Sequence, residues 1–401
     1  KTEKSNLSVF LNYRTLKYED TNKENEPSLN SRILYSDRYF GQLIQTTTAY
    51  ETSSGTIAQQ EFTYLQVEPG QGVYMWNDYN GNGIQELQEF EIAPFPDLAI
   101  YVRVFLPNQV FVRTHQNRFS QALNFNFNQW QNEKGLKKFA SYFYNQTSFL
   151  IERRIRRDGS NFDLNPFSKN DDELIGLNTN FRNSLFFNRG KQYHSTTYSF
   201  LINESQNLIN VQFDGNQNLA SLESISAKNQ SHQLQYQHLV KKSWLFNFSG
   251  STTLTESTSE NYPNRNFEIE SYQVEPKIGY LFSKNASWDI FYEFQQKENQ
   301  IGAFETLKQT RLGTSFTFNS EKGFSMNGEF SMYNNSYEGN ALSAVGFQML
   351  EGLQPGKNQT WRLLLQKNLT QYLDVNINYQ GRNSETSKTI HTGNIQLRAF
   401  F

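Results

Sequence analysis

The residues best suited to chemistry are the oxygen donors of the stretch 78–89. Asp78, Asn80 and Asn82 place side-chain oxygens at its first, third and fifth positions. Gly83 follows at the sixth position, where a chain that wraps around an ion has to turn sharply. This alternation of oxygen donors with a glycine at a fixed offset is the first half of a twelve-residue calcium-binding loop.

The second half of the stretch completes that pattern. Ile84 offers its backbone carbonyl at position seven, Glu86 stands at position nine, and Glu89 at position twelve can bind with both carboxylate oxygens. Calcium prefers six to eight oxygen ligands, so the sequence predicts a Ca²⁺ site formed by Asp78, Asn80, Asn82, Ile84, Glu86 and Glu89. Two Asn in place of Asp reduce the negative charge, so we expect the modest affinity that suits extracellular calcium. The alternative is a solvated Asn-Gly turn with incidental acidic residues.

The flanks of the loop carry no helical pattern. Residues 70–76 read as a strand, and Pro94 and Pro96 interrupt the residues after the loop. A pair of helices around the loop is therefore not expected. The pattern favours a single calcium-stapled loop that acts as a structural clamp.

The elements around this loop are predicted to be β-strands, because apolar and polar residues alternate with a period of two. Tyr272, Val274, Ile278 and Tyr280 fall on one face of such a segment, and the polar residues between them fall on the other. Comparable segments of about 10–12 residues recur along the chain, separated by turns of three to five residues and by longer polar loops. That is the length needed for a tilted β-strand to cross a membrane, whereas strands of globular proteins are usually nearer 5–6 residues.

The composition points to the same class of protein. Of 401 residues, only 36% are hydrophobic, yet 34 are Phe and 22 are Tyr. A soluble core of this size would need more aliphatic residues, and a disordered chain would not carry so many aromatic ones. A strand with one face in lipid and the other in water reconciles the two facts. The net charge of -2 gives no electrostatic reason to expect nucleic-acid binding, and the absence of Cys excludes disulfides and thiolate metal sites.

We therefore predict an all-β protein, a transmembrane antiparallel β-barrel of about 14–18 strands with a small calcium-loop segment. Residues 1–70 are expected to form strands before the calcium segment, residues 71–117 the calcium-loop segment, and residues 118–401 the barrel. The alternative architectures are a soluble β-helix and a β-sandwich. No run of 18 apolar residues predicts a membrane-spanning helix.

The two ends of the sequence add expectations of their own. The chain opens without Met, so we expect a mature product or the C-terminal part of a longer polypeptide. At the other end, Ile395, Leu397, Ala399 and Phe401 alternate with polar residues. A final strand that ends on an aromatic residue resembles the C-terminal signal of bacterial outer-membrane barrels, although Ala399 stands where that signal usually has an aromatic residue.

Three further groups of residues are candidates for function. Arg153, Arg154, Arg156 and Arg157 can contact lipid phosphate or lipopolysaccharide, or can form a solvated strand end. Glu293, Glu329, Arg362 and Arg398 lie on polar faces of predicted strands, where they can bias ion selectivity or hydrate the interior. His232 and His238 lack an acidic partner at metal-ligand spacing. None of the nucleophile or phosphate-loop motifs of common enzymes occurs, so we do not expect an enzyme.

Several stretches in two parts of the sequence carry a resemblance to a known class. The residues 67–76, leading into the calcium loop and residues 89–93, resemble a large class of Bacteroidota outer-membrane proteins. Residues 350–358, 379–382 and 390–393 do so as well. A weaker similarity, in the Trp-Asn-Asp-Tyr-Asn segment at 76–80, is to the barrel of the type 9 secretion translocon. The first resemblance implies a location in the bacterial outer membrane, a barrel fold and calcium binding.

From these observations we expect a calcium-stabilised outer-membrane component of an envelope protein export or assembly system. Its expected partners are outer-membrane lipid, lipopolysaccharide and other envelope proteins, and no nucleic acid. A porin or uptake channel for small solutes is the first alternative, suggested by the polar inner face. A surface binding or adhesion protein is the second.

Overall fold

The computed structural model describes residues 5–18, 25–157, 162–168, 173–191, 193–212, 220–260, 262–320, 323–370 and 372–400, with the backbone alone at 59–61, 108–110, 208–212 and 220–223. In this part of the chain, eighteen strands belong to one sheet. The all-β class that the alternation predicts is confirmed. A β-sandwich is not observed among the described strands, because none of them forms a second sheet.

Leaving aside two short strands, the sheet is a meander of sixteen antiparallel strands in which consecutive strands are neighbours. These strands, which we call the wall, are β1 (Ser5–Leu16), β2 (Glu26–Tyr39), β3 (Ile44–Gln66), β6 (Tyr101–Asn126), β7 (Phe143–Arg156), β8 (Leu174–Phe187), β9 (His194–Gln212), β10 (Ala220–Val240), β11 (Trp244–Ser259), β12 (Phe267–Ser283), β13 (Ala286–Asn299), β14 (Thr306–Ser320), β15 (Phe324–Glu338), β16 (Gly356–Thr370), β17 (Leu373–Ser384) and β18 (Ile390–Ala399). Their number lies within the expected range.

Tight turns at one end of the wall hold neighbouring strands in register. The turn between β10 and β11 places Lys241 and Lys242 at φ angles of 51° and 63°. Two consecutive residues with positive φ match the right-handed twist of the strands that they join. Longer connections lie at the other end, including the one between β15 and β16 that contains helix α2 (Ala344–Leu350). One longer connection, residues 127–142 between β6 and β7 with the short helix α1 (Leu136–Ala140), lies at the end of the tight turns.

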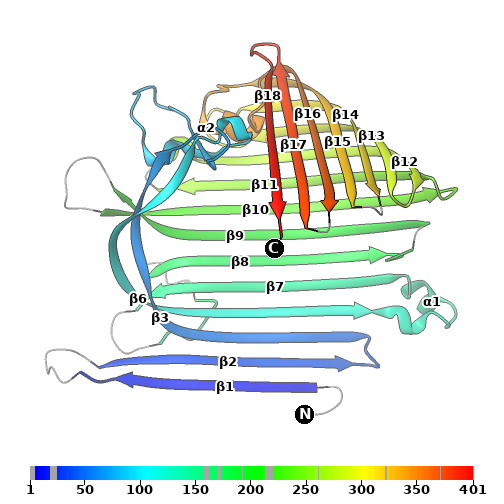
Figure 1. Cartoon of the computed structure of the whole chain (residues 1–401). Coiled ribbons are helices and arrows are strands. Elements are labelled where there is room, and N and C mark those ends of the chain that lie inside the picture. The colour runs from blue at the N-terminus through cyan, green and yellow to red at the C-terminus, as the bar shows by residue number, and fades with distance from the viewer. Residues whose placement is uncertain are drawn as a thin grey trace.

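The two longest strands form a ribbon that leaves the wall. β3 has 23 residues and β6 has 26, and they pair from Ile44↔Phe125 to Gln66↔Tyr101. The neighbours of this pair, β2 and β7, end near its middle. In Figure 1 the free half of the ribbon curves away from the wall toward α2. The boundary drawn from the sequence at residue 117 lies inside β6.

Between the two strands of this ribbon lies the part that we call the inserted segment, residues 67–100. It contains the short strands β4 (Tyr74–Trp76) and β5 (Phe90–Ile92), which pair with each other, and a 3₁₀ turn, η1 (Leu87–Glu89). The strand predicted over 70–76 thus corresponds to β4, and the stretch 78–89 connects β4 to β5.

The side chains of the wall divide between two faces, as strand geometry requires. On one, the outer face, a set of large apolar residues remains 37–47% exposed across β11–β15. We call this set the apolar belt: Trp244, Phe246, Phe248, Tyr272, Val274, Ile278, Trp288, Ile290, Tyr292, Leu312, Phe330 and Met332. The opposite, inner face is polar over the same strands, and α2 packs on it.

The packing of α2 forms a compact apolar cluster at the inner face. Val345, Met349 and Leu350 of the helix are buried against Ile269 of β12 and Leu307 of β14. Ser343 caps the helix, since its Oγ accepts the backbone N–H of Gly346 at 3.0 Å. This cluster holds α2 beside the inserted segment. The cluster is small and covers only part of the inner face of the wall.

Among the described residues, the first and last strands of the wall each have one neighbour. β1 pairs with β2, and β18 pairs with β17. Neither has a strand on its other side within the described ranges. The antiparallel sheet that the barrel prediction required is therefore confirmed, whereas a closed barrel is not seen in this part of the chain. In Figure 1 the wall curls, but β1 and β18 lie at its two ends and are separated from each other.

Candidate functional site

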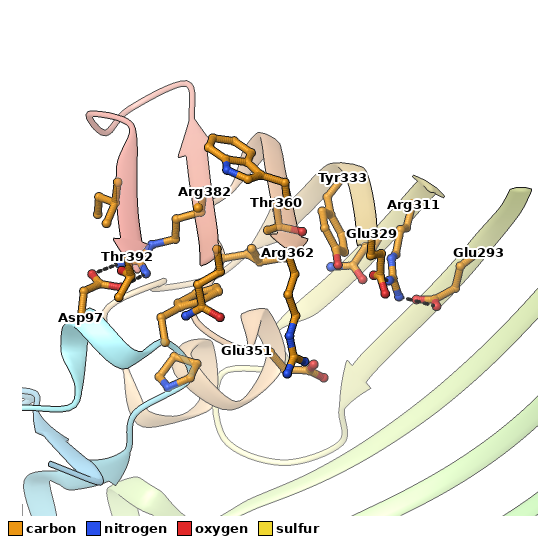
Figure 2. A pocket seen from close by; sticks show the side chains of 18 of the residues that line it. Asp97, Glu293, Arg311, Glu329, Tyr333, Glu351, Thr360, Arg362, Arg382 and Thr392 are labelled. Carbon is orange, nitrogen blue, oxygen red and sulfur yellow. Dashed lines mark hydrogen bonds and ion pairs between the residues drawn. The ribbon is translucent and has the colours of Figure 1, made fainter. Parts of the chain in front are cut away.

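A polar cavity of about 540 Å³ lies on the inner face of β12–β18, next to the inserted segment. Its lining alternates with the apolar belt, because residues of opposite parity on the same strands point to opposite faces. Most of the lining side chains are amides or charged groups: Gln273, Glu293, Gln295, Gln309, Arg311, Glu329, Arg362, Gln380 and Arg382 from the wall, and Asp97 and Glu351 from the connections. Figure 2 shows the charged groups directed toward one another from several strands.

One group of charges in this cavity is centred on Arg311 of β14. Its guanidinium reaches Glu293 of β13 at 3.4 Å and Glu329 of β15 at 2.5 Å (Figure 2). Its Nε also donates to Ser331 Oγ at 3.1 Å. One guanidinium thus ties three neighbouring strands together, and it reaches along β14 to do so, because Glu329 lies opposite Ser315 rather than opposite Arg311.

A second group joins the inserted segment to the wall. Arg382 of β17 donates from both terminal nitrogens to the Asp97 carboxylate, at 2.5 and 2.7 Å. The same guanidinium lies 4.1 Å from the ring centre of Phe95. Paired N–H donors fix the orientation of a carboxylate as well as its position. Both side chains are mostly buried, at 16% and 21% exposure, so this contact anchors the segment over one side of the cavity.

A third contact holds the end of α2. Lys297 of β13 donates to the backbone oxygen of Met349 at 3.0 Å and to the Glu351 carboxylate at 2.5 Å. Arg362 of β16 points into the cavity near Glu351 in Figure 2. Within the described residues, the Arg362 guanidinium has no ion pair, so the cavity holds one cation that is available to a ligand.

Close backbone packing secures the same junction. Gly352, just after α2, has a φ of 80°, and a Cβ atom at this position would lie 2.3 Å from Pro94 Cγ. Only glycine adopts this conformation without strain and leaves room for Pro94. The inserted segment and the α2 connection therefore pack together directly beside the cavity.

The predicted calcium-loop residues lie together in the inserted segment. The Asp78 carboxylate accepts backbone N–H groups from Gly81, Asn82 and Gly83 at 2.8, 3.1 and 2.8 Å. Asn80 Oδ1 accepts the N–H of Asn82, and Asn82 Oδ1 accepts the N–H of Ile84. These bonds wind the chain around the side-chain oxygens, and Gly81 and Gly83 make this possible at φ angles of 72°.

Glu86 and Glu89, the acidic residues in the second half of the loop, are held by hydrogen-bond donors of the inserted segment. Glu89 is 2% exposed, and its carboxylate accepts Trp76 Nε1–H at 2.7 Å and the N–H of Tyr79 at 3.2 Å. Glu86 accepts the Asn80 amide at 2.8 Å, which joins positions three and nine of the loop. In the part of the chain that the structure describes, no three Asp, Glu or His side chains are close enough to hold a metal ion together. A metal here would need the amide and backbone oxygens as well.

Tyr79 of this loop and Glu91 of β5 form a partly buried polar contact within the inserted segment. The Tyr79 hydroxyl donates to Glu91 at 3.4 Å, and Arg265, from the connection between β11 and β12, pairs with the same carboxylate. Burial raises the pKa of Glu91 above its ordinary value, and the positive charge of Arg265 opposes this shift. Burial also raises the pKa of Tyr79, with a further contribution from the negative charge of Glu91.

The structure assembles some of the sequence candidates and separates others. Glu293, Glu329 and Arg362 line the same cavity, whereas Arg398 lies on the open-edged strand β18 and does not. Sequence reasoning missed Arg311 and Arg382, although both occupy polar positions of alternating strands. It also missed Asp97, because this residue follows the calcium loop in a segment without periodicity.

The two remaining groups have structural contacts. Arg153 is buried and pairs with Asp163 at 2.6 Å, and Arg157 donates to Ser54 Oγ at 3.3 Å. These two residues are therefore engaged with the protein itself. His232 Nδ1 and the Tyr198 hydroxyl share a hydrogen bond of 2.8 Å. His238 lies at the turn end of β10.

Comparisons with known proteins add little to this picture. No protein-family model and no curated protein matches the sequence. Among solved structures, the chain is similar to the P. putida toluene transporter TodX, at 7% sequence identity and a TM-score of 0.24, over 99% of this chain and 88% of that one. A likeness at this score supports no inference about fold or function. None of the described helices is long and apolar enough to cross a membrane.

Proposed function

We propose that this protein is an integral outer-membrane wall component of an envelope protein export or assembly system. The observation that carries the proposal is the opposite chemistry of the two faces of one sheet. Across β11–β15, large apolar side chains stay 37–47% exposed on the outer face, while amides and charges line the cavity on the inner face. A sheet in water would bury such a belt against a second layer. Lipid outside and water inside is the environment that suits both faces.

An aromatic row supports a membrane boundary near the short turns. Trp244, Tyr280, Trp288 and Phe316 lie opposite one another on β11, β12, β13 and β14. Aromatic side chains at equal height on neighbouring strands form the girdles at which barrels meet the lipid head groups. The apolar belt extends from this row toward the longer connections, which we therefore place on the far side of the membrane.

The inserted segment favours a gated or scaffolding role over a permanently open pore. It is anchored across one side of the polar cavity by the Asp97–Arg382 pair, and it packs against Gly352. A polar, partly covered interior suits the transit of extended polypeptide, whose backbone needs hydrogen-bond partners. A porin for small solutes is the second candidate, favoured by Arg362, which has no ion pair within the described residues.

Membrane fractionation followed by conductance measurement tests this proposal. We expect the native protein to resist extraction by alkaline carbonate and to co-purify with other envelope proteins in mild detergent. In planar bilayers it should show brief openings, which become longer when Asp97→Asn releases the inserted segment. A steady open conductance in the wild-type protein would support the porin instead, and release by carbonate would contradict membrane integration.

We further propose that Ca²⁺ stabilises the inserted segment at Asp78, Asn80, Asn82, Ile84, Glu86 and Glu89. The support is the loop geometry: backbone N–H groups already orient the oxygens of positions one, three and five, and the carboxylate of position twelve is buried beside them. The calcium ion would replace the protein donors that now satisfy Glu89. With two Asn among the ligands, we expect a Kd on the order of 10⁻⁴–10⁻³ M.

Thermal unfolding with and without chelator measures this effect. We expect chelation to lower the Tm of the wild-type protein, and Glu89→Gln to abolish the difference between the two conditions. Glu68→Gln is the matched control, because Glu68 is an exposed carboxylate of the same segment outside the loop. Equal Tm values of the wild-type protein in calcium and in chelator would remove the site from the proposal.

A further inference from the structure

In the part of the chain that the structure describes, the wall ends on two strands that each pair with one strand only. β1 pairs with β2 over its full length, and β18 pairs with β17 over its full length. Within the ranges that the structure describes, neither strand has another neighbour. Each therefore presents a row of backbone N–H and C=O groups, over residues 6–16 on β1 and over the 10 residues of β18. In hydrocarbon, each unsatisfied backbone group costs several kcal/mol, so open strand edges do not face lipid.

The side chains of the edge strands show the same lack of a neighbour. On β1, Leu7, Val9 and Leu11 are 63–69% exposed, well above the 37–47% of the apolar belt. On β18, Ile395 and Leu397 are 69% and 66% exposed. The strand pairings carry all of these residues onto the outer face. A neighbouring strand with apolar residues on that face would cover them and extend the belt.

The number of strands limits what can fill the gap. Sixteen antiparallel strands place β1 and β18 in opposite directions. An antiparallel closure then requires an even number of added strands. Direct pairing of β1 with β18 would also satisfy this condition, but the two strands stand at opposite ends of the curled wall in Figure 1 and have no pairing within the described ranges.

From these features we infer that β1 and β18 pair with amphipathic β-strands of polypeptide outside residues 1–401. The added strands are antiparallel, even in number, apolar on the outer face and polar on the inner face, and together with the wall they enclose the cavity. This inference rests on the proposed function, because the cost of an open edge is large only in a membrane. It names the kind of partner that an export or assembly component would have.

Site-specific photo-crosslinking in the native membrane tests the inference. A photoreactive residue is placed at Val9 of β1 or at Leu397 of β18, in separate variants of the full protein. Ile278 of β12 is the matched control, because it lies on the same face but has a strand on each side. We expect protein adducts from both edge positions, and mass spectrometry should find in them alternating apolar and polar peptides from outside residues 1–401. Ile278 should label lipid.

The outcomes separate the two proposals. Lipid adducts alone at Val9 and Leu397, or adducts only with residues 1–401, would overturn the inference, the second result indicating direct closure or a second copy of this wall. An adduct with a peptide that lacks the alternation would overturn it as well. Failure of Ile278 to label lipid would instead count against the membrane location, whatever the edge positions show.

Discussion

At the scale of single residues, a few buried ion pairs determine how the inserted segment sits on the wall. Asp97 and Arg382 are 285 positions apart in the chain, yet they form the most specific contact at the cavity. Glu91 and Arg265 form the corresponding contact beneath the calcium loop. In each pair, the attraction between the charges offsets the cost of removing both of them from water. Replacing one partner therefore lowers the stability more than replacing both, because it leaves the other charge without compensation.

Asp97→Asn should therefore weaken the anchoring of the inserted segment. The variant leaves the mostly buried guanidinium of Arg382 without a carboxylate, and we expect a loss of about 1–3 kcal/mol in the free energy of unfolding. Glu385→Gln is the control, because its partner Lys357 is 77% exposed and lies 3.6 Å away. That change should cost less than about 1 kcal/mol. Equal losses in the two variants, measured by urea unfolding in lipid, would contradict the anchoring role.

The raised pKa of Glu91 predicts a pH dependence. A carboxyl group whose folded pKa lies above its unfolded value, about 4.3, gives its full contribution to stability below that pH. The contribution is lost as the pH rises through the folded pKa. We therefore expect the wild-type protein to lose stability relative to Glu91→Gln as the pH rises from about 4 through the raised folded pKa of Glu91. A difference in unfolding free energy that stays constant over this range would contradict the assignment.

At the scale of elements, α2 and the inserted segment form the parts that fill the inner face near the long connections. Met349 is fully buried, and Leu350 nearly so, against β12 and β14. Because α2 has only seven residues, its own backbone hydrogen bonds cannot hold it in place. Its position depends on this apolar contact and on Lys297, which binds the end of the helix.

Met349→Ala should release α2 from the wall. Truncating a fully buried side chain of this size costs about 2–5 kcal/mol. We expect cleavage by added protease between β15 and β16, without loss of the strands themselves. Leu342→Ala, in the same connection but at an 81% exposed position, should leave the protease pattern unchanged. Protection of the connection in the Met349 variant would show that other contacts hold the helix.

At the scale of the whole molecule, the wall is a sheet whose two faces carry different side chains, apolar on the outer face of β11–β15 and polar on the inner face. The only compact apolar cluster that we identify in the described residues lies under α2, and the apolar belt has no described protein layer over it. The stability of such a sheet depends on its surroundings as much as on its own contacts. Charged substitutions should therefore have opposite consequences on the two faces.

Ile278→Lys and Gln295→Lys compare these faces directly. Ile278 belongs to the apolar belt, and Gln295 lines the cavity. We expect the first change to lower the free energy of unfolding in lipid by about 2–4 kcal/mol, because it places a charge in hydrocarbon. The second should cost less than about 1 kcal/mol. Similar effects of the two changes would mean that both faces meet water.

The sequence by itself determined the all-β class, the two faces and the order of candidate ligands in the predicted calcium loop, whereas most wall strands are longer than the predicted 10–12 residues. Each of these is a local property: the period of two sets which side chains of β12 share a face, and the spacing from Asp78 to Glu89 sets the loop. Strand number was predictable within a range for the same reason. Local patterns do not specify which distant segments pair.

Only the tertiary structure decided that Asp97 meets Arg382, that α2 packs on the inner face, and that β1 and β18 stand apart. These contacts depend on the register of the strands and on the path of the β3–β6 ribbon. Both are set by interactions along the whole sheet and not by any local pattern. The closed barrel was expected because amphipathic strands suit one, but alternation is the same in an open wall and a closed one. Closure is a relation between the first and last strands, and no single strand encodes it.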